Sequence, residues 1–179
     1  MQSKIELKSL LFIFAIIFII FLVTIIYFPI KLLAPVSIEN NKFVIPVSYH
    51  ENIIKDTEMN ENFRHVLFTG LHSQLVIMSI PPGGEVGEEI HKYAEQTLFF
   101  LSGTGVGELN DKKFSIIPGD VVVVVPGTKH NFWNTGTNDL KIYTVYAPPN
   151  HIDGRIHKTK ADSDADKADE AIGEINPFK

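Results

Sequence analysis

A nine-residue segment in the middle of the chain, EEIHKYAEQ at positions 88–96, places carboxylate, imidazole and amide side chains close together. Side chains alternate between the two faces of a β-strand, so an extended backbone here would put Glu89 and His91 on one face. The same alternation puts Glu95 and Gln96 on opposite faces. A carboxylate and an imidazole that converge on one centre are suitable ligands for a first-row divalent metal ion. The segment therefore indicates a candidate metal site whose other ligands lie elsewhere in the chain.

The surrounding sequence predicts the strands that would hold this segment extended. From Phe63 onward the chain consists of short apolar runs, such as QLVIMSI, TLFFLS and LKIYTVYA, separated by turn residues as in PPGG, SGTG and NTGTND. Short runs rich in β-branched and aromatic residues, with no helical periodicity between them, predict an antiparallel sandwich or barrel. The run VVVVV at 121–125 is expected to be a buried strand. The fold class expected is all-β.

Two segments carry a resemblance to a known family. GGEVGEEIHKYAEQTLFFLSG (83–103) and GDVVVVVPGTKHNFWN (119–134) resemble the two motifs of the cupin superfamily, written G-x5-H-x-H-x3,4-E-x6-G and G-x5-P-x-G-x2-H-x3-N. The resemblance implies a cupin-type double-stranded β-helix, or jelly-roll barrel. Residues 62–162 are more specifically similar to a group of small cupins labelled mannose-6-phosphate isomerase-like. One departure is Val125, which stands where the second motif has proline.

The motifs also imply a ligand set. Glu89 stands where the family usually has its first histidine, and His91 takes the second histidine position. Gln96, rather than Glu95, fits the spacing to the glycine that ends the first motif, so it stands at the usual glutamate position. The last ligand position is taken by His130. The resemblance thus implies a site of two imidazoles, a carboxylate and a weaker amide oxygen, which suits Fe, Mn, Zn or Ni.

Several functions fit such a site, and the residues do not choose among them. Iron with open coordination positions would suit an oxygenase, whereas zinc or manganese would act as a Lewis acid in an isomerase. A small polar molecule is the expected substrate, and the catalytic residues beyond the ligands are unassigned. The alternative is a non-catalytic barrel that binds a sugar or another small molecule. His151 and His157 are expected in a solvent-exposed loop, with closure over the barrel mouth as the alternative.

The N-terminal region predicts a membrane anchor. Residues 10–28 read LLFIFAIIFIIFLVTIIYF, which as a helix would extend roughly 28 Å, close to the hydrocarbon thickness of a bilayer. We therefore expect one N-terminal transmembrane helix ahead of the barrel and contact with the lipid bilayer through residues 10–28. A cleaved signal peptide is the less favoured alternative. Lysines flank the run on both sides, so the orientation in the membrane stays open.

These patterns divide the chain into four expected parts: a membrane anchor (1–31), a polar spacer (32–62), the cupin β-barrel (63–150) and a C-terminal tail that is a short surface helix or partly disordered (151–179). The net charge is −5, and no stripe of lysine and arginine is present, which argues against nucleic acid as a partner. No cysteine is present, which excludes disulfides and thiolate ligands. A homodimer is expected, as cupins often associate through sheet edges.

Overall fold

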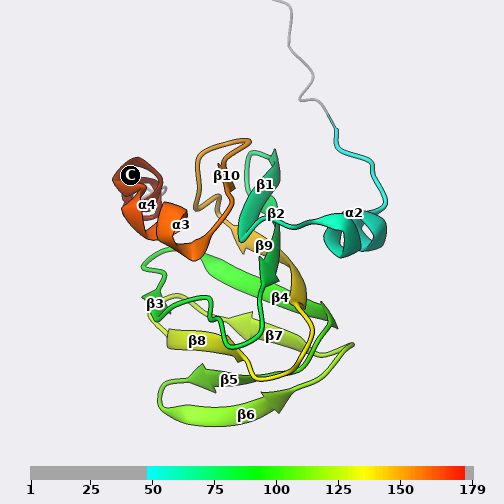
Figure 1. The fold of residues 1–179 in the computed structure, drawn as a ribbon. Coiled ribbons are helices and arrows are strands. Elements are labelled where there is room, and N and C mark those ends of the chain that lie inside the picture. Colours follow the sequence, from blue (N-terminus) through cyan, green and yellow to red (C-terminus); the bar gives the residue numbers. More distant parts are fainter. Residues whose placement is uncertain (1–47, 176–179) are drawn as a thin grey trace, which may run out of the picture. The chain divides into compact units, whose positions relative to one another are not determined.

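The computed structural model describes residues 48–175, which form two antiparallel β-sheets with three short helices outside them (Figure 1). One sheet has six strands in the order β10-β1-β2-β9-β4-β7 and the other has four in the order β3-β8-β5-β6. The strands are β1 (Arg64–Thr69), β2 (Gln74–Ile80), β3 (Glu89–Ile90), β4 (Glu95–Ser102), β5 (Gly105–Leu109), β6 (Lys112–Ile116), β7 (Val121–Val124), β8 (Lys129–Asn134), β9 (Leu140–Ala147) and β10 (Ile156–His157). The helices are α2 (Ile53–Met59), α3 (Lys160–Ala165) and α4 (Lys167–Gly173). The all-β prediction is confirmed.

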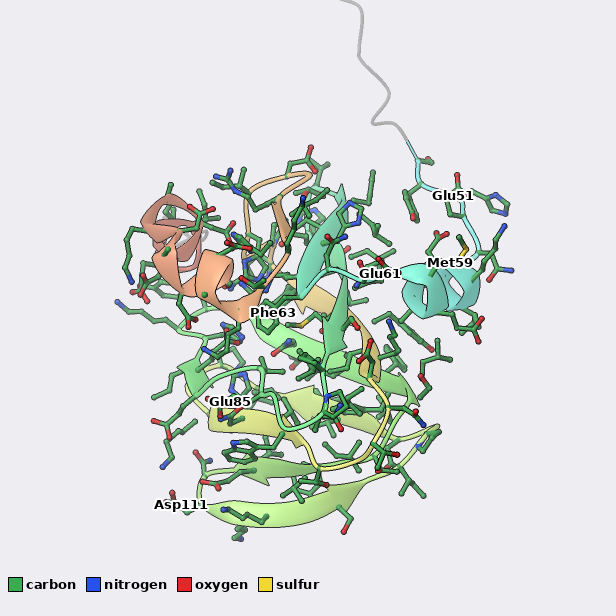
Figure 2. The ribbon with its side chains drawn as sticks, in the orientation of Figure 1. Glu51, Met59, Glu61, Phe63, Glu85 and Asp111 are labelled. Atoms are coloured by element: carbon green, nitrogen blue, oxygen red, sulfur yellow. The ribbon has the colours of Figure 1, made fainter. Side chains whose placement is uncertain are left out.

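The core lies between the two sheets and follows the alternation of side chains along the strands. In β4, Gln96, Leu98 and Phe100 are buried, whereas Glu95 is exposed. Phe132 of β8 packs against Phe100 across the core, with ring centroids 5.5 Å apart. Polar turns close the strand pairs. Asn110 and its neighbour Asp111, labelled in Figure 2, both have positive φ angles in the hairpin that joins β5 to β6, as a tight hairpin turn requires.

The expectation of a buried strand at 121–125 is wrong in part. β7 belongs to the six-stranded sheet, and only the inner face of this strand meets the core. Val122 and Val124 are buried there, but Val121, Val123 and Val125 are each about half exposed. A continuous run of valines can signal burial on both faces. Here it is an alternating edge strand, because no further strand covers the outer face in the part of the chain described.

The C-terminal region continues into two helices, each of which begins at a capping side chain. Thr159 and Asp162 form a reciprocal capping box at the start of α3. Asp166 caps α4 by accepting a hydrogen bond from the backbone N–H of Asp169 at 3.1 Å. In Figure 1 these helices, drawn in orange to dark red, lie at the same end of the molecule as β3 and β10. Of the two expectations for the tail, a short helix is therefore what residues 160–173 show, as α3 and α4.

The expectation that His151 and His157 lie in a solvent-exposed loop is wrong. Their exposed fractions are only 6% and 3%. His151 Nδ1 lies 2.8 Å from Asp169 Oδ2, and His157 Nε2 lies 3.1 Å from Asp166 Oδ2. The carboxylates of the tail cover the two imidazoles, which a reading of local sequence could not anticipate.

The predicted transmembrane helix at residues 10–28 lies outside the described residues. Within residues 48–175 no helix is long and apolar enough to cross a membrane. The anchor, the boundaries of the spacer and the homodimer stay predictions.

Candidate metal centre

Pairing between β3 and β8 brings the first two candidate ligands together from positions far apart in the sequence. Glu89 of β3 lies directly opposite His130 of β8 in the antiparallel register. Residues opposite one another in such a pair have Cβ atoms about 4.5–5.5 Å apart. The turn that precedes β8 adds a backbone link, because Gly127 donates from its N–H to the carbonyl of His91 at 2.8 Å. Gly127 has a φ of +80°, a conformation that favours glycine.

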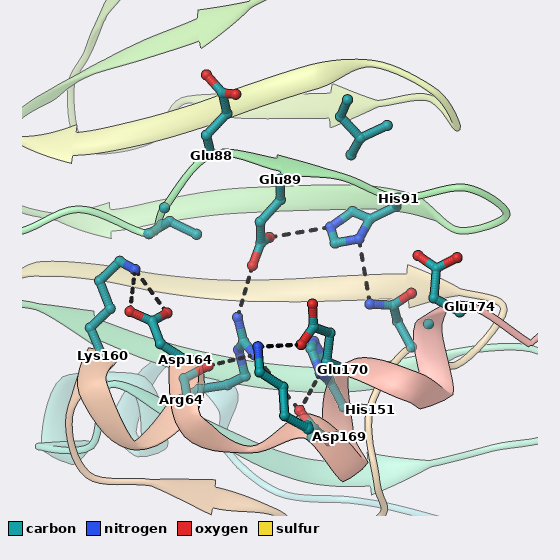
Figure 3. Close-up of a pocket in the computed structure, with 17 residues that line it drawn as sticks. Arg64, Glu88, Glu89, His91, His151, Lys160, Asp164, Asp169, Glu170 and Glu174 are labelled. Atoms are coloured by element: carbon teal, nitrogen blue, oxygen red, sulfur yellow. Dashed lines mark hydrogen bonds and ion pairs between the residues drawn. The ribbon is translucent and has the colours of Figure 1, made fainter.

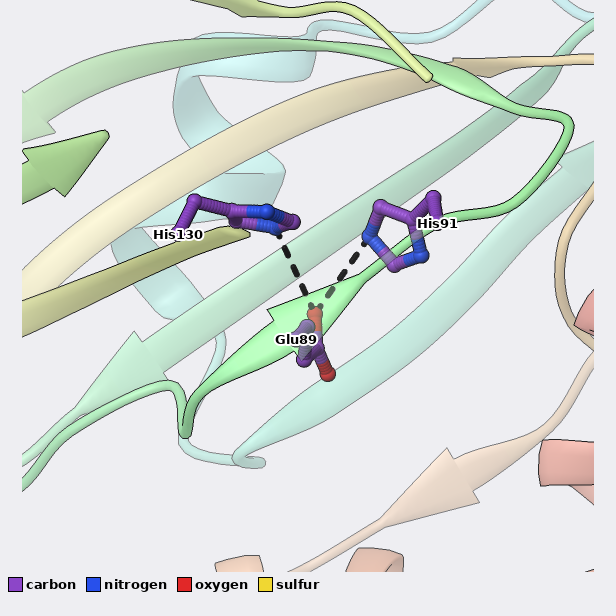
Figure 4. Close-up of side chains that lie close together, drawn as sticks. All are labelled: Glu89, His91 and His130. Carbon is purple, nitrogen blue, oxygen red and sulfur yellow. Dashed lines mark ion pairs between the residues drawn. The ribbon is translucent and has the colours of Figure 1, made fainter. Parts of the chain in front are cut away.

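The three side chains meet at one point, as Figure 4 shows. Glu89 Oε2 lies 3.4 Å from His91 Nε2 and 3.8 Å from His130 Nε2, and the three ligand atoms all lie within 4.8 Å of one another. Two ligand atoms bound to one ion at ~2.1 Å stand roughly 3.0–3.4 Å apart. None of these three buried atoms has a hydrogen-bond partner within the described residues. The donor set and its spacing therefore fit a divalent metal ion.

His130 is held in the form that a metal requires. Its Nδ1 lies 2.9 Å from the carbonyl oxygen of Thr128, to which a neutral ring donates its proton. The Nε2 lone pair then faces Glu89 and is free to bind. Burial lowers the pKa of His130, against the opposing effect of the Thr128 hydrogen bond. The ring is therefore neutral at pH 7, and no proton has to leave it before a metal binds.

Arg64 of β1 holds the other oxygen of Glu89. Arg64 Nη2 lies 3.1 Å from Glu89 Oε1, which leaves Oε2 turned toward the two histidines (Figures 3 and 4). Burial by itself would raise the pKa of Glu89, but the nearby His91 side chain and the charge of Arg64 outweigh it and hold that pKa well below its usual value. Glu89 is therefore a carboxylate throughout the neutral range.

Gln96 lies on the inner face of β4, as the alternation predicts, and Glu95 is exposed. Its Nε2 donates to the hydroxyl oxygen of Tyr146 at 2.8 Å, while its buried Oε1 has no partner within the described residues. The Tyr146 ring in turn lies edge-on to His91, with centroids 5.4 Å apart. Gln96 thus sits one side chain away from the three converging ligands. Its participation as a fourth ligand stays a prediction.

A pocket of about 470 Å³ opens beside this centre, between β3 and the two C-terminal helices (Figure 3). Glu89 and His91 line it from one side, and Asp169 and Glu170 of α4 line it from the other. Arg64 joins the two walls, because its Nη1 lies 3.8 Å from Asp169 Oδ2. These roles of Arg64 and Asp169 could not be predicted from local sequence, since one residue lies among strand residues and the other in a run that resembles a solvated helix.

Asn150 and the end of the second motif complete the surroundings. Asn150 Nδ2 lies 3.4 Å from His91 Nδ1, on the far side of the ring from Glu89. Asn134, which ends the second motif, donates from Nδ2 to the carbonyl of Ile80 at 2.7 Å and accepts from the N–H of Gly136 at 2.9 Å. Asn134 is therefore a structural residue that holds the turn after β8. The Val125 departure leaves His130 within reach of Glu89.

Comparisons with known proteins agree with this architecture. The family described as "Cupin domain" matches residues 76–146. The uncharacterized protein YrkC of Bacillus subtilis is 40% identical over 124 residues, which are 66% of this chain and 67% of that protein. The uncharacterized protein L612 of Acanthamoeba polyphaga mimivirus is 33% identical over 125 residues, 68% of this chain and 74% of that one. The crystal structure of BH2720 from Bacillus halodurans, 36% identical, matches with a TM-score of 0.66 over 67% of this chain and 96% of that chain. The chain belongs to the cupin family.

Replacement of Arg64 tests its role as the counter-ion of buried carboxylates. We expect Arg64→Met to lower the free energy of unfolding of the metal-free protein by about 3–5 kcal/mol, because Glu89 and Asp169 then keep buried charges without their cation. Urea unfolding measures the change. Arg155→Met is the matched control, since Arg155 pairs with Asp166 at a more exposed position, and should cost about 1 kcal/mol or less. Equal losses in the two variants would contradict this role.

Proposed function

We propose that the barrel binds one divalent metal ion through Glu89, His91 and His130, with Gln96 as a fourth ligand, and acts on a small polar molecule in the adjoining pocket. The observation that carries the proposal is the set of buried atoms without hydrogen-bond partners in residues 48–175: Glu89 Oε2, His91 Nε2, Gln96 Oε1 and His130 Nε2. Burying such groups unpaired costs free energy, and proteins rarely accept several at one place without a ligand that satisfies them.

The chain's own residues define how the site would work. His91 and His130 present nitrogen ligands, Glu89 supplies one oxygen while Arg64 holds the other, and the pocket leaves room for a ligand beside them. A bound divalent ion would supply positive charge to a carbonyl or hydroxyl oxygen of that ligand. Isomerase-like chemistry on a hydroxy-carbonyl compound and oxygenase-like chemistry with iron are both compatible with two histidines and one carboxylate.

The metal content of the purified full-length protein tests the proposal. Elemental mass spectrometry should find near-stoichiometric Fe, Mn, Zn or Ni in the wild-type chain. A His91→Ala/His130→Ala double variant should lose it, because only Glu89 of the three converging ligands remains. The control is His50→Ala/His72→Ala, which removes two histidines distant in sequence from the motifs and should keep the metal. Absence of metal from the wild type, even after reloading with each of these ions, would contradict the proposal and favour a non-catalytic binding barrel.

Gln96 can be tested separately with its neighbour as the control. We expect Gln96→Leu to weaken metal binding by roughly 10-fold, because it removes the oxygen but keeps an inward-facing side chain of similar size. Glu95→Gln changes the adjacent, exposed residue and should leave the affinity unchanged. Competition with a chromogenic chelator measures both constants. An unaltered affinity in Gln96→Leu would restrict the ligand set to Glu89, His91 and His130.

A further inference from the structure

His151 is a second buried imidazole that lines the same pocket as His91. It follows β9 in the chain and has an exposed fraction of 6%. Its Nε2 has no hydrogen-bond partner within the described residues, whereas its Nδ1 lies 2.8 Å from Asp169 Oδ2. A histidine that donates from Nδ1 to a carboxylate keeps a free lone pair on Nε2, which is the arrangement of a proton acceptor.

Asp169 is fixed so that it can orient His151. Its Oδ1 accepts from the backbone N–H of Ile152 at 2.7 Å, and its Oδ2 faces both His151 Nδ1 and Arg64 Nη1. Burial alone would raise the pKa of Asp169, but the hydrogen bond from His151, the N–H of Ile152 and the charge of Arg64 lower it overall. Burial lowers the pKa of His151 despite Asp169. The pair therefore consists of a carboxylate and a neutral imidazole at pH 7.

Tyr146 links this pair to the metal centre. Its ring lies edge-on to His151, with centroids 4.9 Å apart, and edge-on to His91, with centroids 5.4 Å apart. His91 and His151 therefore flank one aromatic ring and line one pocket of about 470 Å³. Figure 3 shows His151 and Asp169 on the side of the pocket formed by the C-terminal helices, facing Glu89 and His91.

The charges of the pocket indicate the kind of ligand. Arg64, Lys160 and Lys167 are the lysine and arginine side chains that line it. Each is already paired: Arg64 with Glu89, Lys160 with Asp164 at 2.8 Å, and Lys167 with Glu170 at 2.7 Å. Acidic side chains outnumber these cations in the lining. Apart from the proposed metal ion, a phosphate or carboxylate ligand would find no unpaired lysine or arginine among these lining residues, so the pocket suits an uncharged molecule that reaches the ion through its hydroxyl and carbonyl oxygens.

We propose that His151 is the catalytic base of this site, positioned by Asp169, and that it acts on an uncharged hydroxy-carbonyl compound. His151 Nε2 takes the proton from the carbon between the hydroxyl and the carbonyl. The electron pair of that C–H bond forms a C=C bond, and the carbonyl π pair passes to oxygen. For isomerisation, the hydroxyl proton passes to the charged oxygen, the hydroxyl carbon becomes the new carbonyl carbon, and the C=C electron pair takes the proton from His151 at the neighbouring carbon. Return of the proton to the same carbon instead regenerates the starting compound, with exchange if His151 has meanwhile exchanged it with solvent. This inference rests on the proposed metal site, which would stabilise the charged oxygen.

Nuclear magnetic resonance of the metal-free, full-length protein labelled with 15N-histidine tests the geometry without any activity. His151, assigned as the signal lost in His151→Gln, should be neutral at pH 7 with its proton on Nδ1. In Asp169→Asn, the amide oxygen keeps the bond to the Ile152 N–H, so the amide nitrogen faces His151 Nδ1 and the proton should move to Nε2. His157, whose Nε2 faces Asp166, should not change. A charged His151, or one already protonated on Nε2 in the wild type, would overturn the proposal.

Proton exchange with glycolaldehyde in D2O tests the chemistry of the metal-loaded protein. Wild type should incorporate deuterium at the carbon beside the carbonyl, and His151→Gln should do so at least roughly 100-fold more slowly with its metal content unchanged. His157→Gln alters the other buried histidine of a histidine–aspartate pair, which does not line the pocket, and should exchange like wild type. Metal-loaded wild type that fails to exchange, or His151→Gln that exchanges normally, would overturn the proposed base. A wild type that binds no metal would instead overturn the proposed function.

Discussion

The buried carboxylate of Glu89 is the constraint around which this end of the barrel is built. A charge removed from water must be paired, and one cation rarely satisfies both oxygens of a carboxylate. Arg64 pairs with Oε1, whereas Oε2 faces the Nε2 atoms of His91 and His130 and has no hydrogen-bond partner within the described residues. A divalent ion placed there would complete the pairing and satisfy the histidines together. The inward charge on β3 would thus be fully paired only when a bound ion joins the partners from β1 and β8.

The need to pair buried charges also links the C-terminal tail to the barrel. Arg64 also lies 3.8 Å from Asp169, donates to Ser163 at 3.1 Å, and so ties α3 and α4 to the barrel mouth. Asp169 is therefore buried and holds His151. The charges from Glu89 through Arg64 to Asp169 form one connected network, so the helices that close the pocket and the candidate metal ligands are not independent. The tail is a wall of the site rather than an appendage.

Some residues of this network could be predicted from the sequence, and others could not. Glu89, His91 and Gln96 follow from local alternation and motif spacing, and the structure places the first two beside His130 with Gln96 on the inner face nearby. Arg64, Asp169 and His151 could not be assigned, because their burial depends on contacts between residues far apart in sequence. In isolation, the tail's alternating small and charged residues read as a solvated surface. The half-exposed valines of β7 were missed because a valine run does not reveal whether one face or both faces of the strand are covered.

The central claim is that one metal ion binds between Glu89, His91 and His130. The most direct measurement is X-ray diffraction from crystals of the metal-loaded protein, recorded above and below the absorption edge of the ion. The account predicts a single anomalous peak at about 2.0–2.2 Å from Glu89 Oε2, His91 Nε2 and His130 Nε2. Electron density at this place without an anomalous signal, or a peak bound elsewhere with these three side chains unligated, would contradict it.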